Sequence, residues 1–155
     1  MHEGASGWCG RRHRWASERR GELGLRFVRV LLDTHAVLWA AEGDARLGTS
    51  AAELMRTLKT GEAVISDITL LEIAMLAKRG RIRLSVSAGE YLRGIQRNYP
   101  PLMITSEITA LAMDLALPHG DPFDRIIVAS ARHHELPLLT RDRNISASGL
   151  VRVVW

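Results

Sequence analysis

One stretch of the sequence, HGDPFDRIIVASARHHELPLLTRD (residues 119–142), decides the fold. Its apolar periodicity predicts a helix from Pro122 to about Glu135, and LPLLT (136–140) predicts a buried strand directly after it. Three aspartates surround these two apolar segments, at positions 121, 124 and 142. Acidic groups in such places either cap helices and turns or hold something positively charged.

The alternation of strand and helix continues outward in both directions. Strands are predicted at 27–33, 63–66, 101–105, 136–140 and 151–155, and helices at 35–43, 50–61, 67–80, 87–98, 106–117 and 122–135. Ser50 with Glu53, and Ser87 with Glu90, form capping-box pairs at two helix starts. Strands that alternate with helices predict an α/β fold with a central, mainly parallel sheet covered on both faces. In such sheets, sites form beyond the carboxyl ends of the strands.

Length and composition indicate one ordinary soluble domain. The chain has 155 residues, of which 46% are hydrophobic and 25% charged, as in typical globular proteins. Its longest apolar runs are far too short to cross a bilayer, and no secretory signal is visible. The single cysteine, Cys9, excludes an internal disulfide and is consistent with a reducing compartment, so we expect a cytoplasmic protein.

The positive charge of the chain lies at its N-terminal end. The whole chain carries 21 basic and 17 acidic residues, and residues 1–29 hold seven arginines and three glutamates. Subtraction leaves 14 basic and 14 acidic residues in 30–155, a net charge of zero. The overall basicity therefore says little about the folded body.

Residues 1–27 are predicted to be a disordered basic extension, ahead of one domain at 28–155. The segment is rich in glycine and lacks apolar periodicity, so it cannot bury enough surface to offset its chain entropy. Three alternatives remain open for this segment. It is an RNA-binding arm in which Trp8 and Trp15 stack on bases, an arginine-rich transit peptide, or an upstream sequence before a true start near Val28 or Val30.

Four acidic residues occupy positions that converge in a parallel sheet. Asp33 ends the strand RVLLD, and Asp142 follows the strand LPLLT by two residues. Glu72 sits on a helix that is apolar on nearly every side, and Asp124 shares a helical stripe with apolar residues. Each has a structural alternative: a helix N-cap for Asp33, a salt bridge to an arginine for Glu72, helix-start placement for Asp124 and a turn for Asp142.

Together the four carboxylates favour a metal site. Two carboxylates about 6 Å apart repel by roughly 3 kcal/mol at an effective dielectric of about 20. A group of four is severely destabilising unless it is protonated or meets a divalent cation, and oxygen ligands suit Mg²⁺ or Mn²⁺. Zinc is disfavoured because the histidines and Cys9 lack ligand spacing. No P-loop and no G-x-S-x-G motif occurs, so neither nucleotide hydrolysis nor acyl transfer is indicated.

Five blocks resemble PIN-domain ribonucleases in order along the chain. They are LLDTHAVLW (31–39), ISDITLLEIAMLAKRGRIRL (65–84), HGDPFDRIIVASA (119–131), LLTRD (138–142) and the VRVVW tail. Within that family they look most like the VapC toxins of type II toxin–antitoxin modules. The resemblance covers residues 28–155. It implies a three-layer α/β/α fold and Mg²⁺- or Mn²⁺-dependent endonucleolytic cleavage of RNA.

The resemblance also assigns roles to residues. It implies that the metal ligands and catalytic acids are Asp33, Glu72, Asp124 and Asp142. Asp121, which before Pro122 reads as an N-cap, is an auxiliary ligand or only that cap. Residues implied to line the site are Thr140, Thr34 and Ser66. Arg125 and Arg141 contact RNA phosphates or are simple surface charges. Metal-activated water would attack the phosphodiester in line and leave 5′-phosphate and 3′-hydroxyl ends.

The resemblance further implies partners. A cognate VapB-like antitoxin is expected to cover the acidic cleft, a homodimer is expected, and transfer RNA and a ribosomal RNA loop are both plausible substrates. Two other functions remain open: a PIN-fold module that binds RNA or protein without cutting, and a PIN nuclease that acts in RNA processing or on DNA without an antitoxin. All four acidic positions are filled, which favours the enzyme.

Overall fold

The fold is built on a five-stranded sheet in which every strand is parallel to its neighbours. The computed structural model describes residues 29–117 and 120–155, so the predicted extension at 1–27 and the start of the first predicted strand lie outside the described residues. The strands are β1 (Val30–Leu32), β2 (Ala63–Ser66), β3 (Pro101–Leu102), β4 (Leu138–Leu139) and β5 (Val153–Val154). Their order is β3-β2-β1-β4-β5, and all pairs are parallel. The predicted parallel sheet is confirmed.

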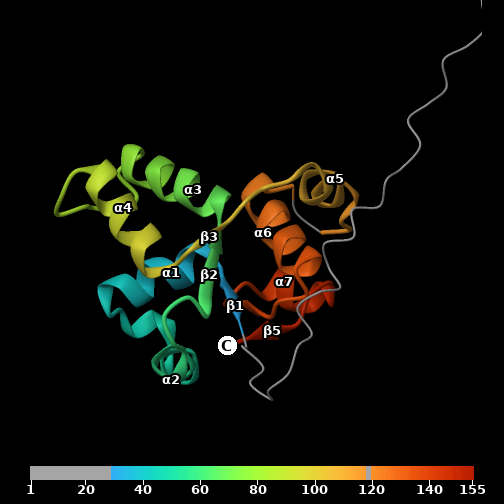
Figure 1. Ribbon diagram of the computed structural model, residues 1–155, viewed down its shortest axis with the longest axis horizontal. Coiled ribbons are helices and arrows are strands. Elements are labelled where there is room, and N and C mark those ends of the chain that lie inside the picture. The colour runs from blue at the N-terminus through green and yellow to red at the C-terminus, as the bar shows by residue number, and fades with distance from the viewer. Residues whose placement is uncertain (1–28, 118–119) are drawn as a thin grey trace, which may run out of the picture.

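Helices cover both faces of this sheet, which gives three layers (Figure 1). On one side are α1 (Thr34–Glu42), the 3-10 helix η1 (Ala45–Leu47), α2 (Thr49–Thr57), α3 (Asp67–Lys78) and α4 (Ala88–Asn98). On the other side are α5 (Ser106–Asp114), α6 (Pro122–His133) and α7 (Arg143–Ser148). The predicted α/β/α architecture is confirmed.

The alternation of side chains along each strand feeds two separate cores. Val30 and Leu32 of β1 point into the core under α1 to α4. Leu31, between them, points into the core under α5 to α7. All three are at most 1% exposed, because both faces of the sheet are covered. The continuous apolar strand sequence follows from this double burial.

The start and end of α2 differ from the sequence prediction. The helix begins at Thr49 after an N-cap at Gly48, and not at a capping box formed by Ser50 and Glu53. Gly48 also ends η1 and has a φ of 76°, a backbone conformation that favours glycine. The 3-10 turn therefore fixes the helix start one residue early. The helix also ends at Thr57, ahead of the predicted end at Gly61.

The outer strands are shorter than predicted, and one helix was not predicted. Apolar residues beyond the ends of β3, β4 and β5, such as Ile104, Leu136 and Val151, pack against the core from loops. Burial alone explains their apolar character, so the sequence overstates the strands. Helix α7 follows Asp142, whose Oδ1 accepts hydrogen bonds from the backbone N–H groups of the first turn. Its C-cap is Gly149 at a φ of 64°.

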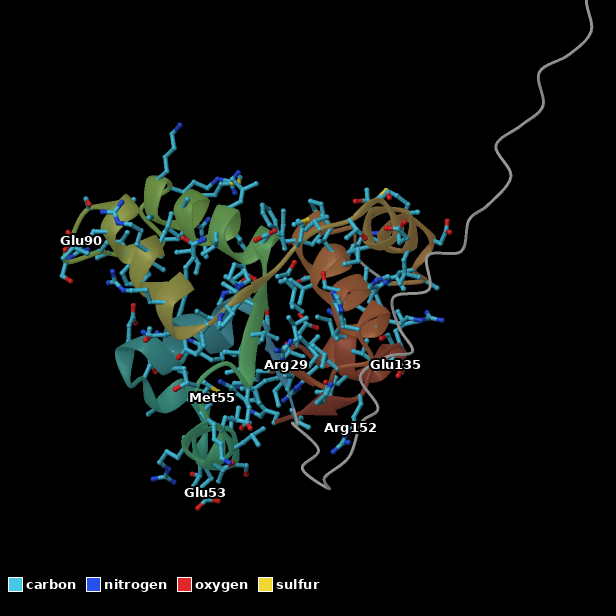
Figure 2. All side chains as sticks on the ribbon, viewed as in Figure 1. Arg29, Glu53, Met55, Glu90, Glu135 and Arg152 are labelled. Atoms are coloured by element: carbon cyan, nitrogen blue, oxygen red, sulfur yellow. The ribbon has the colours of Figure 1, made fainter. Side chains whose placement is uncertain are left out.

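Charged side chains lie on the outside of the helical layers. Glu53, Glu90 and Arg152 are exposed, and Figure 2 shows them at the periphery of the molecule. Within the described residues, every helix is too short or too polar to cross a bilayer.

The direction of the sheet order reverses beside β1. From β1 the chain proceeds outward to β2 and β3 on one side, and β4 and β5 lie on the other side. In parallel α/β sheets, the loops at such a reversal leave a crevice at the carboxyl ends of the strands. Asp33 follows β1 and Thr140 follows β4, so both residues lie at this position.

Candidate active site

An acidic cleft of about 600 Å³ opens at the carboxyl ends of the strands. Its lining residues are Asp33, His35, Trp39, Glu72, Asp121, Asp124, Arg141, Asp142 and Arg143. Five carboxylates thus face two guanidinium groups. The four acidic residues that the sequence singled out, and Asp121 with them, come together in this one cleft.

Asp33 is the most deeply placed of these carboxylates. Its backbone N–H donates to the carbonyl of Leu139 (3.0 Å), which ties the end of β1 to β4. It occupies the N-cap position of α1, yet its carboxylate makes no capping hydrogen bond. Instead, Oδ2 accepts a hydrogen bond from Thr140 Oγ1 at 2.8 Å. Burial raises the pKa of Asp33, and the Thr140 hydrogen bond opposes that rise. The N-cap alternative therefore does not explain this carboxylate.

Thr140 connects two of the cleft acids. Its hydroxyl donates to Asp33 and accepts from the backbone N–H of Asp142 at 3.0 Å. Asp142 in turn caps α7, because its Oδ1 accepts from the N–H groups of Asn144 (2.7 Å) and Ile145 (3.0 Å). The second carboxylate oxygen of Asp142 is not used in this cap. Helix capping and cleft lining are therefore compatible in the same residue.

Glu72 reaches the cleft from α3 and is held by Thr34. Its Oε2 accepts a hydrogen bond from Thr34 Oγ1 at 2.5 Å. Burial raises the pKa of Glu72, and the nearby charge of Asp33 adds to the rise. Among the residues that the structure describes, no arginine forms an ion pair with Glu72. The described residues therefore give the salt-bridge alternative no support, and Thr34 is a buried residue that orients Glu72.

Asp121 and Asp124 come from the start of α6. Asp121 is the N-cap, and its Oδ1 accepts from the N–H of Phe123 at 2.9 Å, with Pro122 at the first helical position. Asp124, in the first turn, has its pKa raised to about 7, first by burial and then by the charges of the other four cleft carboxylates. Without a cation, negative charge at Asp124 is therefore disfavoured well above the ordinary titration range of an aspartate.

The carboxylates are near one another but are not arranged as a ready coordination shell. In residues 29–117 and 120–155, no three His, Cys, Asp or Glu side chains are grouped so that they would hold one metal ion. Burial is the main cause of the raised pKa values of Asp33, Glu72 and Asp124, and neighbouring carboxylates add to each of them. An ion would have to draw these side chains together.

Comparison with known proteins agrees with this architecture. The PIN domain profile matches residues 30–149. The chain belongs to the PIN domain family. Ribonuclease VapC22 of Mycobacterium tuberculosis is 32% identical to it over 118 residues, which are 75% of this chain and 88% of that protein.

Solved structures share the fold of this PIN domain. A toxin–antitoxin complex from Klebsiella pneumoniae matches with a TM-score of 0.57 and 22% identity, covering 79% of this chain and 94% of that chain. Mycobacterium tuberculosis VapC20, described as a sarcin-ricin loop cleaving toxin, matches with a TM-score of 0.58 and 21% identity, covering 80% and 98%. At these identities the likeness concerns the fold alone.

Ser66, which was expected to line the site, stabilises the scaffold of the PIN domain instead. Ser66 is buried, and its Oγ lies 3.2 Å from Ser130 Oγ, which itself donates to the carbonyl of Ile126 (2.8 Å). Since the Ser130 proton is committed, Ser66 is the donor between the two hydroxyls, and it does not line the cleft. Its small hydroxyl joins β2 to α6.

Arg125, expected as a phosphate contact, points away from the acidic cleft. Its Nε donates to the carbonyl of Ala112 at 3.0 Å, and its Nη2 donates to the carbonyls of Met113 (3.0 Å) and Leu115 (2.7 Å). These are carbonyls at the C-terminal end of α5, where helices lack internal partners. The guanidinium therefore caps one helix from the neighbouring one.

Arg125→Ala is expected to lower the free energy of unfolding by about 1–3 kcal/mol, because three carbonyls lose a charged donor. Denaturation in urea would measure the loss. Arg132→Ala, an exposed arginine on the same helix, is the control and should change stability little. An Arg125→Ala variant with unchanged stability and weakened RNA binding would support the phosphate contact instead.

The sequence analysis missed three residues of the cleft: His35, Trp39 and Arg143. His35 and Trp39 are four residues apart on α1, so they share a helix face, and their ring centroids are 5.7 Å apart. Asp33 at the end of β1 already fixes the side of α1 that meets the cleft. The positions of His35 and Trp39, two and six residues after Asp33, could therefore have identified both rings as cleft residues.

Proposed function

We propose that this PIN domain is a divalent-metal-dependent endoribonuclease and the toxin of a type II toxin–antitoxin module. One observation carries the proposal: five carboxylates from four separated segments converge in one cleft of a chain related to a ribonuclease, VapC22. Carboxylates gathered at this density are costly for the fold unless they serve a cation.

The donor set fits a hard divalent ion. The cleft offers carboxylate oxygens and no thiolate, which suits Mg²⁺ or Mn²⁺ better than zinc. We assign Asp33 and Asp124 as direct ligands, Glu72 and Asp142 as ligands directly or through water, and Asp121 as an auxiliary ligand. When bound, the ion would supply activation of water and stabilisation of negative charge at the scissile phosphate.

Side chains around the acids would set their orientation for the reaction. Thr140 holds Asp33 and Thr34 holds Glu72, so a buried hydroxyl orients each of the two carboxylates. Asp124, whose pKa is about 7 without a metal, would be deprotonated when it binds the ion. Arg141 and Arg143 line the same cleft and would contact phosphates of the RNA. The products would carry 5′-phosphate and 3′-hydroxyl ends.

A cognate VapB-like antitoxin and a homodimer belong to this proposal. The fold is shared with chains solved in toxin–antitoxin complexes, including one from Klebsiella pneumoniae. An acidic cleft would accept a basic antitoxin segment by charge complementarity. The RNA substrate would place the protein in the cytoplasm, with transfer RNA and a ribosomal RNA loop as candidate targets.

RNA cleavage by the purified chain is expected to require Mg²⁺ or Mn²⁺, to stop in excess EDTA and to return when the ion is restored. Sequencing of RNA 5′ ends would locate the cuts and identify the substrate. RNA binding without cleavage at any divalent ion concentration would point to a non-cleaving module. Cleavage by a chain whose expression does not arrest growth, and which no neighbouring small protein inhibits, would point to an RNA-processing nuclease.

A further inference from the structure

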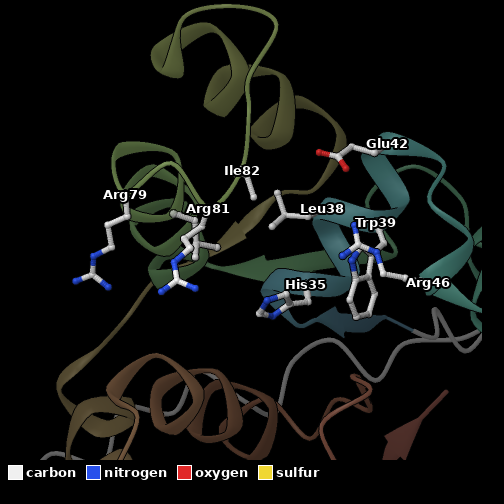
Figure 3. Close-up of a pocket in the computed structure, with 9 residues that line it drawn as sticks. His35, Leu38, Trp39, Glu42, Arg46, Arg79, Arg81 and Ile82 are labelled. Atoms are coloured by element: carbon white, nitrogen blue, oxygen red, sulfur yellow. The ribbon is translucent and has the colours of Figure 1, made fainter.

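A second pocket, of about 400 Å³, lies beside the acidic cleft (Figure 3). The two share one wall, because His35 and Trp39 line both of them. The far side of the pocket carries Arg79 and Arg81 from the end of α3. The function proposed above does not use this pocket.

Arg79 and Arg81 present positive charge that no described residue neutralises through an ion pair. Both are exposed, and neither forms an ion pair with another described residue. Their backbones are fixed, since the N–H of Arg79 donates to Met75 (3.0 Å) and that of Arg81 to Leu76 (2.9 Å). In the view of Figure 3, Arg81 and, beyond it, Arg79 lie on one side of His35, and Trp39 lies on the other. Two neighbouring guanidinium groups, on fixed backbones and without an ion pair among the described residues, suit an anion.

The shared wall is aromatic and rigid. Trp39 is held by the edge of Trp155 (ring centroids 5.8 Å apart) and by Arg46, whose guanidinium carbon lies 5.5 Å from the indole centroid. Arg46 is itself paired with Asp44 at 2.5 Å. The ring of His35 is exposed beside Trp39. A planar ligand would therefore meet a ready aromatic surface, with Leu38, Leu76 and Ile82 as apolar lining.

We propose that this pocket binds a nucleotide next to the scissile phosphate of single-stranded RNA. Arg79 and Arg81 contact backbone phosphates, and the base lies against His35 and Trp39. The inference rests on the proposed function, since it extends the substrate path out of the same cleft. A ligand that combines a flat base with adjacent phosphates matches both walls. The pocket also contains one carboxylate, Glu42. In the view of Figure 3, Glu42 lies farther from His35 than Leu38 does and away from Arg79 and Arg81, so the end of the pocket that carries the two arginines stays positive.

Charge arithmetic supports RNA as the occupant. Residues 30–155 have no net charge, and the cleft carries more acidic than basic groups. A polyanion is therefore repelled at the very place where it would react. Arg141 and Arg143 offset part of this repulsion within the cleft. Arg79 and Arg81 add positive charge next to the cleft, across the wall shared through His35 and Trp39.

The test is RNA affinity of the full chain in an Asp33→Asn background, which prevents cleavage. Fluorescence anisotropy with a labelled single-stranded RNA oligonucleotide would be measured over a range of salt concentrations. The double variant Arg79→Ala, Arg81→Ala is expected to bind at least about tenfold more weakly, and the slope of log K against log salt should fall by about 1.4, or roughly 0.7 per phosphate contact. The control, Arg83→Ala with Arg97→Ala, removes two exposed charges outside the pocket and should behave like the parent.

The base contact has a separate readout. His35→Ala is expected to weaken binding of the oligonucleotide about fivefold or more, and to leave binding of an abasic strand of equal length unchanged. If the Arg79→Ala, Arg81→Ala variant and the control variant bind RNA with equal affinity and equal salt slope, the proposal is overturned. An acidic polypeptide would then be the better candidate for the occupant of the pocket. Cleavage by the wild-type chain is scored independently. If the wild-type chain cuts RNA but its RNA affinity does not depend on Arg79 and Arg81, only the proposed nucleotide-binding pocket is contradicted. If RNA binding depends on these arginines but the wild-type chain never cuts RNA, only the proposed ribonuclease activity is contradicted.

Discussion

Asp33→Asn is expected to reduce RNA cleavage by at least about a hundredfold, because even groups that only support metal ligands are worth 10–100-fold. Asparagine has the same shape and keeps an oxygen that accepts the Thr140 hydrogen bond. The change removes the charge of a carboxylate that is only 7% exposed. Burial already raises the pKa of Asp33, so the fold does not depend on its ionised form. The variant should therefore melt no lower than the wild type.

Initial cleavage rates on a labelled RNA, with Mg²⁺ or Mn²⁺ in excess, would measure this effect beside thermal melting. Asp114→Asn is the matched control, since Asp114 is an exposed aspartate at the end of α5, outside the cleft. It should cleave at the wild-type rate. Wild-type activity of Asp33→Asn would remove Asp33 from the reaction and, with it, the proposed metal site.

Most of the architecture was predictable because helix periodicity and capping are local. The helix capped by Ser87 was located correctly, since Ser87 accepts from the N–H of Glu90 as the sequence predicted. The strands were harder. An apolar residue such as Val151 is buried from a loop as readily as from a strand, so hydrophobicity fixes burial but not pairing. Helix α7 was missed although Asp142 and Gly149 bracket it with an N-cap and a C-cap.

The meeting of the acids was predictable because parallel strands bring their carboxyl ends to one edge. Which contacts hold each acid was not predictable, since those contacts join distant segments. Thr34 meets Glu72 across 38 residues, and Thr140 meets Asp33 across 107. Arg125 shows that closeness in the sequence can also mislead. A basic residue one position from Asp124 looks like part of the site, but on a helix adjacent residues point about 100° apart.

Stability in the absence of divalent ions is expected to fall as the pH rises from about 4 to about 7. The pKa of Asp124 is about 7 in the folded protein against an ordinary value of 3.8. Across that range the folded state binds more protons than the unfolded state, so the free energy of unfolding decreases with rising pH. The effect is complete above about pH 7. Asp33 and Glu72, whose pKa values are also raised, act in the same direction.

Asp124→Asn should remove part of this pH dependence. Below about pH 4 both the folded and the unfolded wild type carry a neutral group at position 124, so the two proteins should melt at similar temperatures there. At pH 8 the substitution loses the favourable interaction of a carboxylate with the start of α6, about 0.3–1 kcal/mol. It also relieves repulsion from the other four cleft carboxylates. Even after discounting for partial exposure, repulsion from several neighbours outweighs one helix-dipole interaction.

Melting temperatures in EDTA at about pH 3.5, where little difference is expected, and at pH 8 would decide which effect dominates. Asp124→Asn should exceed the wild type at pH 8 by a few degrees, at about 2–4 °C per kcal/mol. Saturating Mn²⁺ should reverse the order, because the wild type gains binding energy that the variant lacks. Glu107→Gln is the control, and it should melt below the wild type at pH 8. Glu107 lies in the first turn of α5, and hydrogen bonds lower its pKa, so its ionised form stabilises the fold. If Asp124→Asn instead melts below the wild type at pH 8 in EDTA, capping is the main role of Asp124, and the crowding of charge that motivates an ion at this cleft is too weak to need one.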